Sequence, residues 1–213
     1  MSIFRITSIA KKFIMALSGL FLIIFLLVHL GVNLLLLSDN EDLFNEASHF
    51  MATNPLIKLM QYVLALGFLV HILSGIALTV QNKLARPDGY SYNKPSANSS
   101  IESRTMIISG ILVLLFLILH MRNFFYHLKF GHVPEGGDYM LVSDLFDIWY
   151  YTLIYVVSFV ILGLHLNHGF QSSFQSLGAN NKTWMHVWKK AGTIYSVIVA
   201  GGFSVIALYL FFN

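Results

Sequence analysis

Five long apolar runs without a single charged residue constrain what this chain can fold into. They cover residues 13–37, 59–80, 105–121, 148–170 and 191–212. A helix needs about 20 residues to cross a hydrocarbon core of about 30 Å, so each run is long enough, or nearly so, to span a membrane. Only 11% of the 213 residues are charged, against about a quarter in a soluble domain. The runs leave no room for a separate soluble domain.

The sequence therefore predicts one all-α, polytopic membrane domain over residues 1–213. The third helix is expected to continue past its apolar run through Phe124 and Tyr126. The expected spans are 13–37, 59–80, 105–128, 148–170 and 191–212. The chain has no cysteine, which excludes disulfides, Fe–S ligation and thiolate metal sites. We find no internal repeat in the sequence.

Charged residues sort between alternate connections. Ten basic residues lie at the N-terminus and in the second and fourth connections: Arg5, Lys11, Lys12, Lys83, Arg86, Lys94, Arg104, Lys182, Lys189 and Lys190. Eight of the ten acids lie on the other side: Asp39, Glu41, Asp42, Glu46, Glu135, Asp138, Asp144 and Asp147. Lys and Arg favour the cytoplasmic side, so we expect a multi-pass protein of the cell's inner (cytoplasmic) membrane, surrounded by lipid, with its N-terminus inside and its C-terminus outside. Charges sorted in this way form no single basic patch, so we expect no nucleic-acid partner.

Six of the nine histidines lie within the first four spans, and four of these six lie at two matching depths. Imidazole in hydrocarbon is costly without a partner, so an intramembrane histidine indicates a functional site, while any one alone is also compatible with a hydrogen bond between helices. His29 and His120 lie about 24 to 25 Å from the inner ends of their spans, near the outer surface. His71 and His165 lie about 20 to 24 Å from the outer ends of theirs, near the inner surface. The others are His127 and His168 on the same helices, and His49, His132 and His186 in loops.

Two pairs at two depths suit two stacked metal cofactors better than one metal ion. Zinc requires three or four ligands at one point, whereas a haem needs only axial ligands, and two histidines fill both. Glycine follows each inner histidine by four residues, as Gly75 and Gly169. Residues four apart share a helix face, so these glycines are expected to leave space for a flat macrocycle. The sequence therefore predicts a haem-binding four-helix bundle plus one extra helix.

These residues resemble the dihaem cytochrome b membrane-anchor subunit of succinate:quinone oxidoreductases and quinol:fumarate reductases. The matching stretches are Phe25–Leu30, His71 with Gly75, Leu119–His120 and His165–Phe170. The similarity covers about residues 10 to 212. It implies an inner haem b on His71 and His165 and an outer haem b on His29 and His120. It also implies an iron–sulfur subunit and a flavoprotein subunit as partners on the inner face, with electrons passing to menaquinone as the substrate.

The resemblance also suggests further site residues. Glu46 is the candidate carboxylate at an outer quinone site, with Glu41 next, and Arg122 is the candidate partner of a haem propionate. Some fumarate reductases of this family carry a glutamate, linked to proton movement, two residues before the inner ligand of the fourth span. Gly163 stands there in this chain, which favours succinate oxidation, in a succinate dehydrogenase (complex II), over fumarate reduction.

Two alternatives remain open at this stage. Quinol–cytochrome c reductases place two ligands 13 or 14 residues apart on each of two helices, whereas same-helix histidines here are seven or three apart. A proton-coupled transporter that uses buried histidines as relays is the alternative from another class, and it is expected to show inverted repeats or broken helices.

Overall fold

The computed structural model describes residues 7–85, 101–131, 134–179 and 181–213, and these are almost entirely helical, without strands. Five long helices are apolar enough to cross a membrane, as expected. They are α1 (Ser8–Asn33), α3 (Pro55–Leu84), α5 (Ile101–His120), α8 (Trp149–Ser176) and α9 (Lys182–Phe212). Each extends past its apolar run at one end or both, and polar side chains cap the first turns of α1, α3 and α9. Asn54, for example, caps the first turn of α3 through the amides of Leu56 and Ile57.

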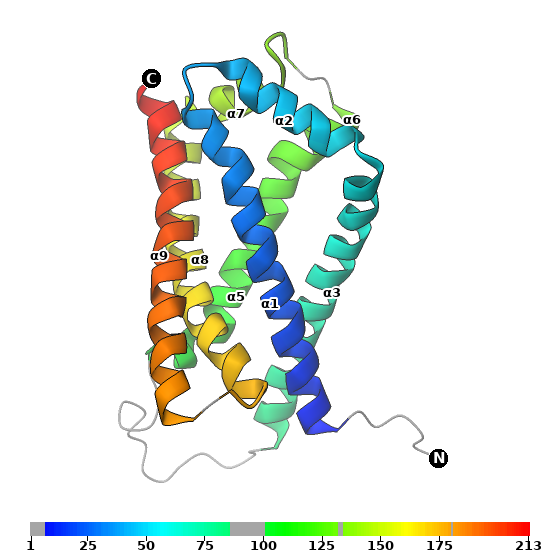
Figure 1. Ribbon diagram of the computed structural model, residues 1–213, viewed down its shortest axis with the longest axis vertical. Helices are drawn as coiled ribbons and strands as arrows, with labels where there is room; N and C mark the ends of the chain where they lie inside the picture. The colour runs from blue at the N-terminus through cyan, green and yellow to red at the C-terminus, as the bar shows by residue number, and fades with distance from the viewer. Residues whose placement is uncertain (1–6, 86–100, 132–133, 180) are drawn as a thin grey trace.

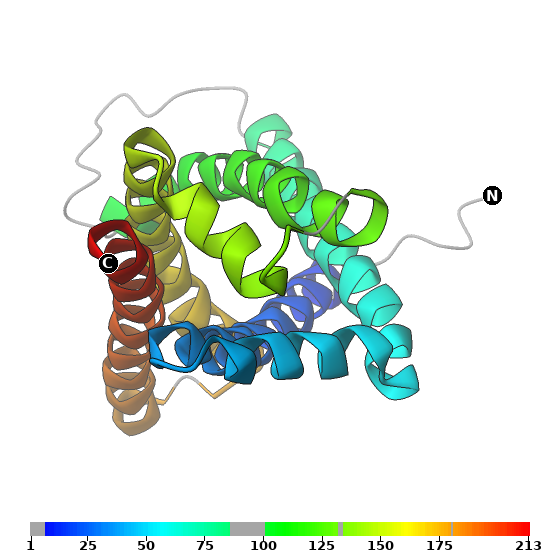
Figure 2. The ribbon, with the colours of Figure 1, turned by 90° about the horizontal axis from the view of Figure 1, so that it is seen from above.

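The four histidine-bearing helices form two antiparallel pairs, and α9 stands outside them. α1 packs along α3, and α5 packs along α8, while α1 also contacts α8. α9 packs along α8 at the edge of the molecule far from α3 (Figures 1 and 2). The arrangement is therefore a four-helix bundle with one extra helix.

α8 and α9 make the most extensive helix–helix contact among the described residues. Gly163 is buried, and a Cβ atom there would lie 2.9 Å from the Cβ of Ala200. Tyr195 donates a hydrogen bond of 2.7 Å to the Ile23 carbonyl, which ties α9 to α1. By contrast, α3 has no fully buried side chain. The apolar core therefore lies between α1, α8 and α9.

Two short helices, which the sequence did not predict, cover the acidic end of the bundle, which is the end that we expect to face outward and call the outer end. They are α2 (Glu41–Thr53) and α7 (Gly137–Phe146), and α7 lies across the middle of that end (Figure 2). Asn40 caps α2 by accepting from the Asp42 amide. The side chain of Asn45 on α2 donates to the Gly136 carbonyl and accepts from the Tyr139 amide, both at 2.9 Å. Ser48 also donates to Asp138. His49, which we expected in a loop, therefore lies on a helix.

The two ends of the bundle differ in charge. The start of α1, the end of α3 and the start of α9 meet at one end, with Lys11, Lys83 and Lys182 on them (Figure 1). α2, α7 and the residues next to them lie at the other end and hold eight of the ten acidic residues. The same side as Lys182 holds His186, which the structure places on α9 rather than in a loop. Arg5, Arg86, Lys94 and His132, which the sequence analysis used, lie outside the described residues.

Candidate functional site

The inner pair of intramembrane histidines meets between α3 and α8. The ring centres of His71 and His165 lie 6.4 Å apart, at an angle of 78°. Each ring also faces a serine hydroxyl on a neighbouring helix. Ser109 Oγ lies 3.2 Å from His165 Nδ1, and Ser18 Oγ lies 3.5 Å from His71 Nδ1. The two rings therefore approach each other while each Nδ1 edge faces a hydroxyl.

The outer pair meets between α1 and α5. The ring centres of His29 and His120 lie 5.8 Å apart, at an angle of 88°. Asn33 donates to the His29 carbonyl at 2.8 Å, and the same amide nitrogen lies 3.5 Å from His29 Nδ1. The Nδ1 atom of His120 is buried without a hydrogen-bond partner among the described residues. The outer rings thus lack the hydroxyl that each inner ring has.

A repeat links the two pairs, contrary to our expectation from the sequence. α1 and α5 both carry Ser-Gly, then five residues, Phe, three residues and His, over 18–29 and 109–120. The Ser-Gly end of each motif contacts an inner histidine, and its Phe packs on the outer histidine four residues later. Ten residues separate the glycine from the histidine, which is about 15 Å along a helix. The two motifs escape notice because only five of their twelve positions are identical.

The glycines that border the inner rings are not the ones that we expected. Cβ atoms at Gly19 and Gly110 would lie 3.4 Å from the Cε1 atoms of His71 and His165, respectively. Gly75 and Gly169, which the sequence singled out, face the methyl groups of Met15 and Met106 instead. Gly67 lies against the ring of Phe21. The space beside each inner ring is therefore kept open by a glycine on the helix that packs along the histidine's own helix.

The donor set and its spacing fit a bis-histidine metal cofactor. Two imidazoles bound to one metal by bonds of about 2 Å have ring centres about 6 to 6.5 Å apart, close to both observed distances. Among the described residues, no group of three or more potential metal ligands gathers. A haem brings its own four equatorial nitrogens and requires only two axial ligands, so a pair suffices.

A buried aromatic group holds the outer pair in place. Tyr155 is 1% exposed, and its hydroxyl accepts a hydrogen bond of 3.1 Å from the amide of Asn123. Its ring also packs beside His120 and Phe116. Asn123 belongs to a π-helical stretch, Met121–Tyr126, which follows His120 directly. Such stretches occur frequently at functional sites, and apolar periodicity could not have revealed this one.

A polar hollow of about 260 Å³ opens at the outer end, beside the π-helical stretch. Its lining comprises Arg122, Asn123, His127, Leu141, Asp144, Leu145, Ile148 and Tyr151. Arg122 is exposed there, and Glu46 is exposed on α2, outside the lining. On α7, burial raises the pKa of Tyr139, and the nearby Glu41 carboxylate raises it further. The lining of the hollow thus combines the guanidinium of Arg122, the imidazole of His127 and the carboxylate of Asp144, at the acidic end of the molecule.

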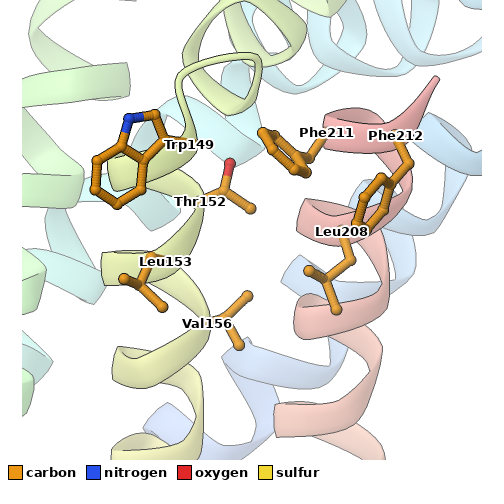
Figure 3. A pocket seen from close by; sticks show the side chains of 7 residues that line it. All are labelled: Trp149, Thr152, Leu153, Val156, Leu208, Phe211 and Phe212. Carbon is orange, nitrogen blue, oxygen red and sulfur yellow. The ribbon is translucent and has the colours of Figure 1, made fainter.

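A second hollow, of about 290 Å³, lies between the outer ends of α8 and α9 (Figure 3). It is lined by Trp149, Thr152, Leu153, Val156, Leu208, Phe211 and Phe212. The Thr152 hydroxyl donates to the Phe146 carbonyl at 2.6 Å, so the one hydroxyl of the lining is already engaged. This hollow is an apolar surface without acid–base groups.

Comparison of the chain with protein-family profiles, curated proteins and solved structures finds no match. The functional argument therefore depends on the two histidine pairs and the polar hollow.

Proposed function

We propose that this chain is the membrane-anchor and electron-transfer subunit of a succinate:quinone oxidoreductase. The observation that carries the proposal is the approach of His71 to His165 and of His29 to His120, at two depths of one bundle. Each pair would hold one haem b through its two imidazoles. When bound, the two haems would supply one-electron carriers near opposite faces of the membrane.

The residues around the pairs support this assignment. Gly19 and Gly110 keep side chains away from the inner rings, while Phe25 and Phe116 pack on the outer ones. Two axial histidines leave no open coordination position, which favours electron transfer over oxygen chemistry. The helices run without a break between the two levels, and the π-helical stretch begins only after His120, whereas transporters use helices broken near the midplane.

Quinone reduction fits the outer end best. Reduction takes up two protons, and general acids and bases must lie within reach of the quinone oxygens. The polar hollow offers His127 and Asp144 beside Arg122. Glu46 lies at the same end on α2 and stays a candidate relay. The five spans contain no Asp or Glu, so these protons come from the outer aqueous phase.

The inner end is the proposed docking face for the iron–sulfur and flavoprotein subunits. Lys182, Lys189 and Lys190 lie there at the start of α9, with Trp184 exposed beside them. This orientation assumes that the basic end faces the cytoplasm. Succinate oxidation is the favoured direction, because the close contact of Gly163 with α9 leaves no room for a proton-carrying side chain at that position.

A haem count on purified protein tests the proposal. The chain is expected to carry two low-spin b haems in a pyridine haemochrome assay, and the oxidised form should show no high-spin signal. One haem or none in folded protein contradicts it. Mass spectrometry of the native complex then tests the partners, because a flavoprotein and an iron–sulfur subunit should co-purify.

A further inference from the structure

The two serines beside the inner histidines are matched in position and in hydrogen bonding. Ser18 and Ser109 occupy the same place in the repeated motif, and each is at most 9% exposed. Their hydroxyl oxygens lie 3.5 and 3.2 Å from the Nδ1 atoms of His71 and His165. Each serine lies on a helix that supplies an outer histidine, α1 for Ser18 and α5 for Ser109. It contacts the inner histidine of the helix that packs along its own.

The direction of each serine proton is set by a second contact. The Ser109 hydroxyl donates to the Met106 carbonyl at 3.0 Å, and the Ser18 hydroxyl donates to the Met15 carbonyl at 3.1 Å. A hydroxyl has a single proton to donate. Each oxygen therefore faces its histidine as an acceptor, and the ring must donate from Nδ1–H. A neutral imidazole carries only one N–H, so Nε2 keeps its lone pair.

We infer that Ser18 and Ser109 are positioning residues that hold His71 and His165 in the tautomer whose Nε2 atom binds a metal. The inference rests on the proposed function, since it names what the inner pair does toward its haem. Histidine ligands of metals generally donate their other N–H to a protein acceptor, which fixes the ring and raises its basicity. Here one hydroxyl serves each ring.

The outer pair has no equivalent device. The amide nitrogen of Asn33 lies near His29 Nδ1 and donates to the His29 carbonyl. An amide nitrogen is a donor only, so it cannot accept a hydrogen bond from the ring. His120 Nδ1 is without a partner among the described residues. The serines therefore act on the inner site alone. A general effect on packing would change both sites, so the two roles can be distinguished.

The test compares Ser109→Ala and Ser18→Ala with Ser196→Ala. Ser196 is the matched control, because it is 5% exposed and donates to a helix carbonyl, that of Gly192, at 2.6 Å. Loss of the acceptor weakens the donor strength of the imidazole, so the midpoint potential of the inner haem should rise. Haem affinity at that site should fall by about 10- to 100-fold. The outer haem should keep its potential, and Ser196→Ala should change neither.

Two further arms complete the design. Ser109→Ala should have the larger effect, because Ser109 Oγ lies 3.2 Å from His165 Nδ1, whereas Ser18 Oγ lies 3.5 Å from His71 Nδ1. Ser109→Thr keeps the hydroxyl and should restore the inner potential. Two bound haems with an inner potential equal to that of Ser196→Ala would overturn the inference while leaving the proposed function intact. Absence of haem from the unmutated protein would overturn both.

Discussion

The amide of Asn123 donates a hydrogen bond of 3.1 Å to the hydroxyl of Tyr155, and both residues are buried beside His120. Asn123 sits in the π-helical stretch, where the extra residue in the turn redirects side chains. The bond therefore joins the π-helical stretch that follows α5 to the first turns of α8. It links the geometry of the outer histidine pair to the stability of the bundle.

Tyr155→Phe should destabilise the protein, because it leaves the Asn123 amide buried without an acceptor. The expected loss is about 1–3 kcal/mol in the free energy of unfolding, measured by thermal unfolding in detergent. Tyr150→Phe is the control, since Tyr150 is exposed. Equal stability of the two variants would show that the bond contributes nothing.

Replacing single histidines should remove haems in a set pattern. His71→Ala or His165→Ala should abolish the inner haem, and His29→Ala or His120→Ala the outer one, so each variant retains one haem per chain by pyridine haemochrome. The physical reason is that, in the proposed site, each pair would supply both axial ligands of one iron. His49→Ala, on α2, should retain two. Loss of the same haem from His29→Ala and His71→Ala would contradict this pairing.

Gly110→Ala should weaken the inner haem without unfolding the protein. The added Cβ lies 3.4 Å from Cε1 of His165, an ordinary van der Waals distance, so the protein folds, but the methyl fills the space beside the ring. An overpacking cost of about 1–3 kcal/mol corresponds to a loss in affinity of about 5- to 150-fold. Haem titration measures it. Gly201→Ala, where the added atom meets nothing within 4 Å, should bind normally.

Gly163→Ala should destabilise the contact between α8 and α9. Its Cβ would lie 2.9 Å from that of Ala200, and separating the helices should cost about 1–3 kcal/mol. Gly201→Ala again provides the comparison and should be neutral or stabilising, because alanine is the better helix former. A Gly163→Ala protein as stable as the unmutated one would show that the two helices adjust freely.

Asp144→Asn should slow quinone turnover more than Glu46→Gln, because Asp144 lines the polar hollow and Glu46 does not. A positioned acid or base contributes about 10²-fold or more, so a loss of about that size is expected for Asp144→Asn. Both variants should keep two haems and should oxidise succinate normally with a soluble acceptor. A larger effect from Glu46→Gln would move the quinone site from the hollow to α2.

The sequence predicted the five spans, and it paired the histidines whose rings the structure places side by side. Hydropathy is a local property of the sequence, and depth follows from position along a helix. The sequence missed α2, whose acidic first turn reads as a loop, although Asn40 caps it and Phe44 is buried. It also selected Gly75 and Gly169 in place of Gly19 and Gly110. Residues on the same helix can be paired from spacing, whereas contacts such as Ser109 with His165 depend on how two helices meet.

The division of each histidine pair between two helical hairpins has a consequence for how the bundle is assembled. α1 and α3 together supply His29 and His71, one histidine to each pair, and α5 and α8 supply the other two. Neither hairpin contains a complete pair, so a half-inserted chain has no finished site at either level. A cofactor bound at both pairs would crosslink the two hairpins at two levels. Its binding would therefore show that both halves of the polypeptide are inserted in the membrane and packed together.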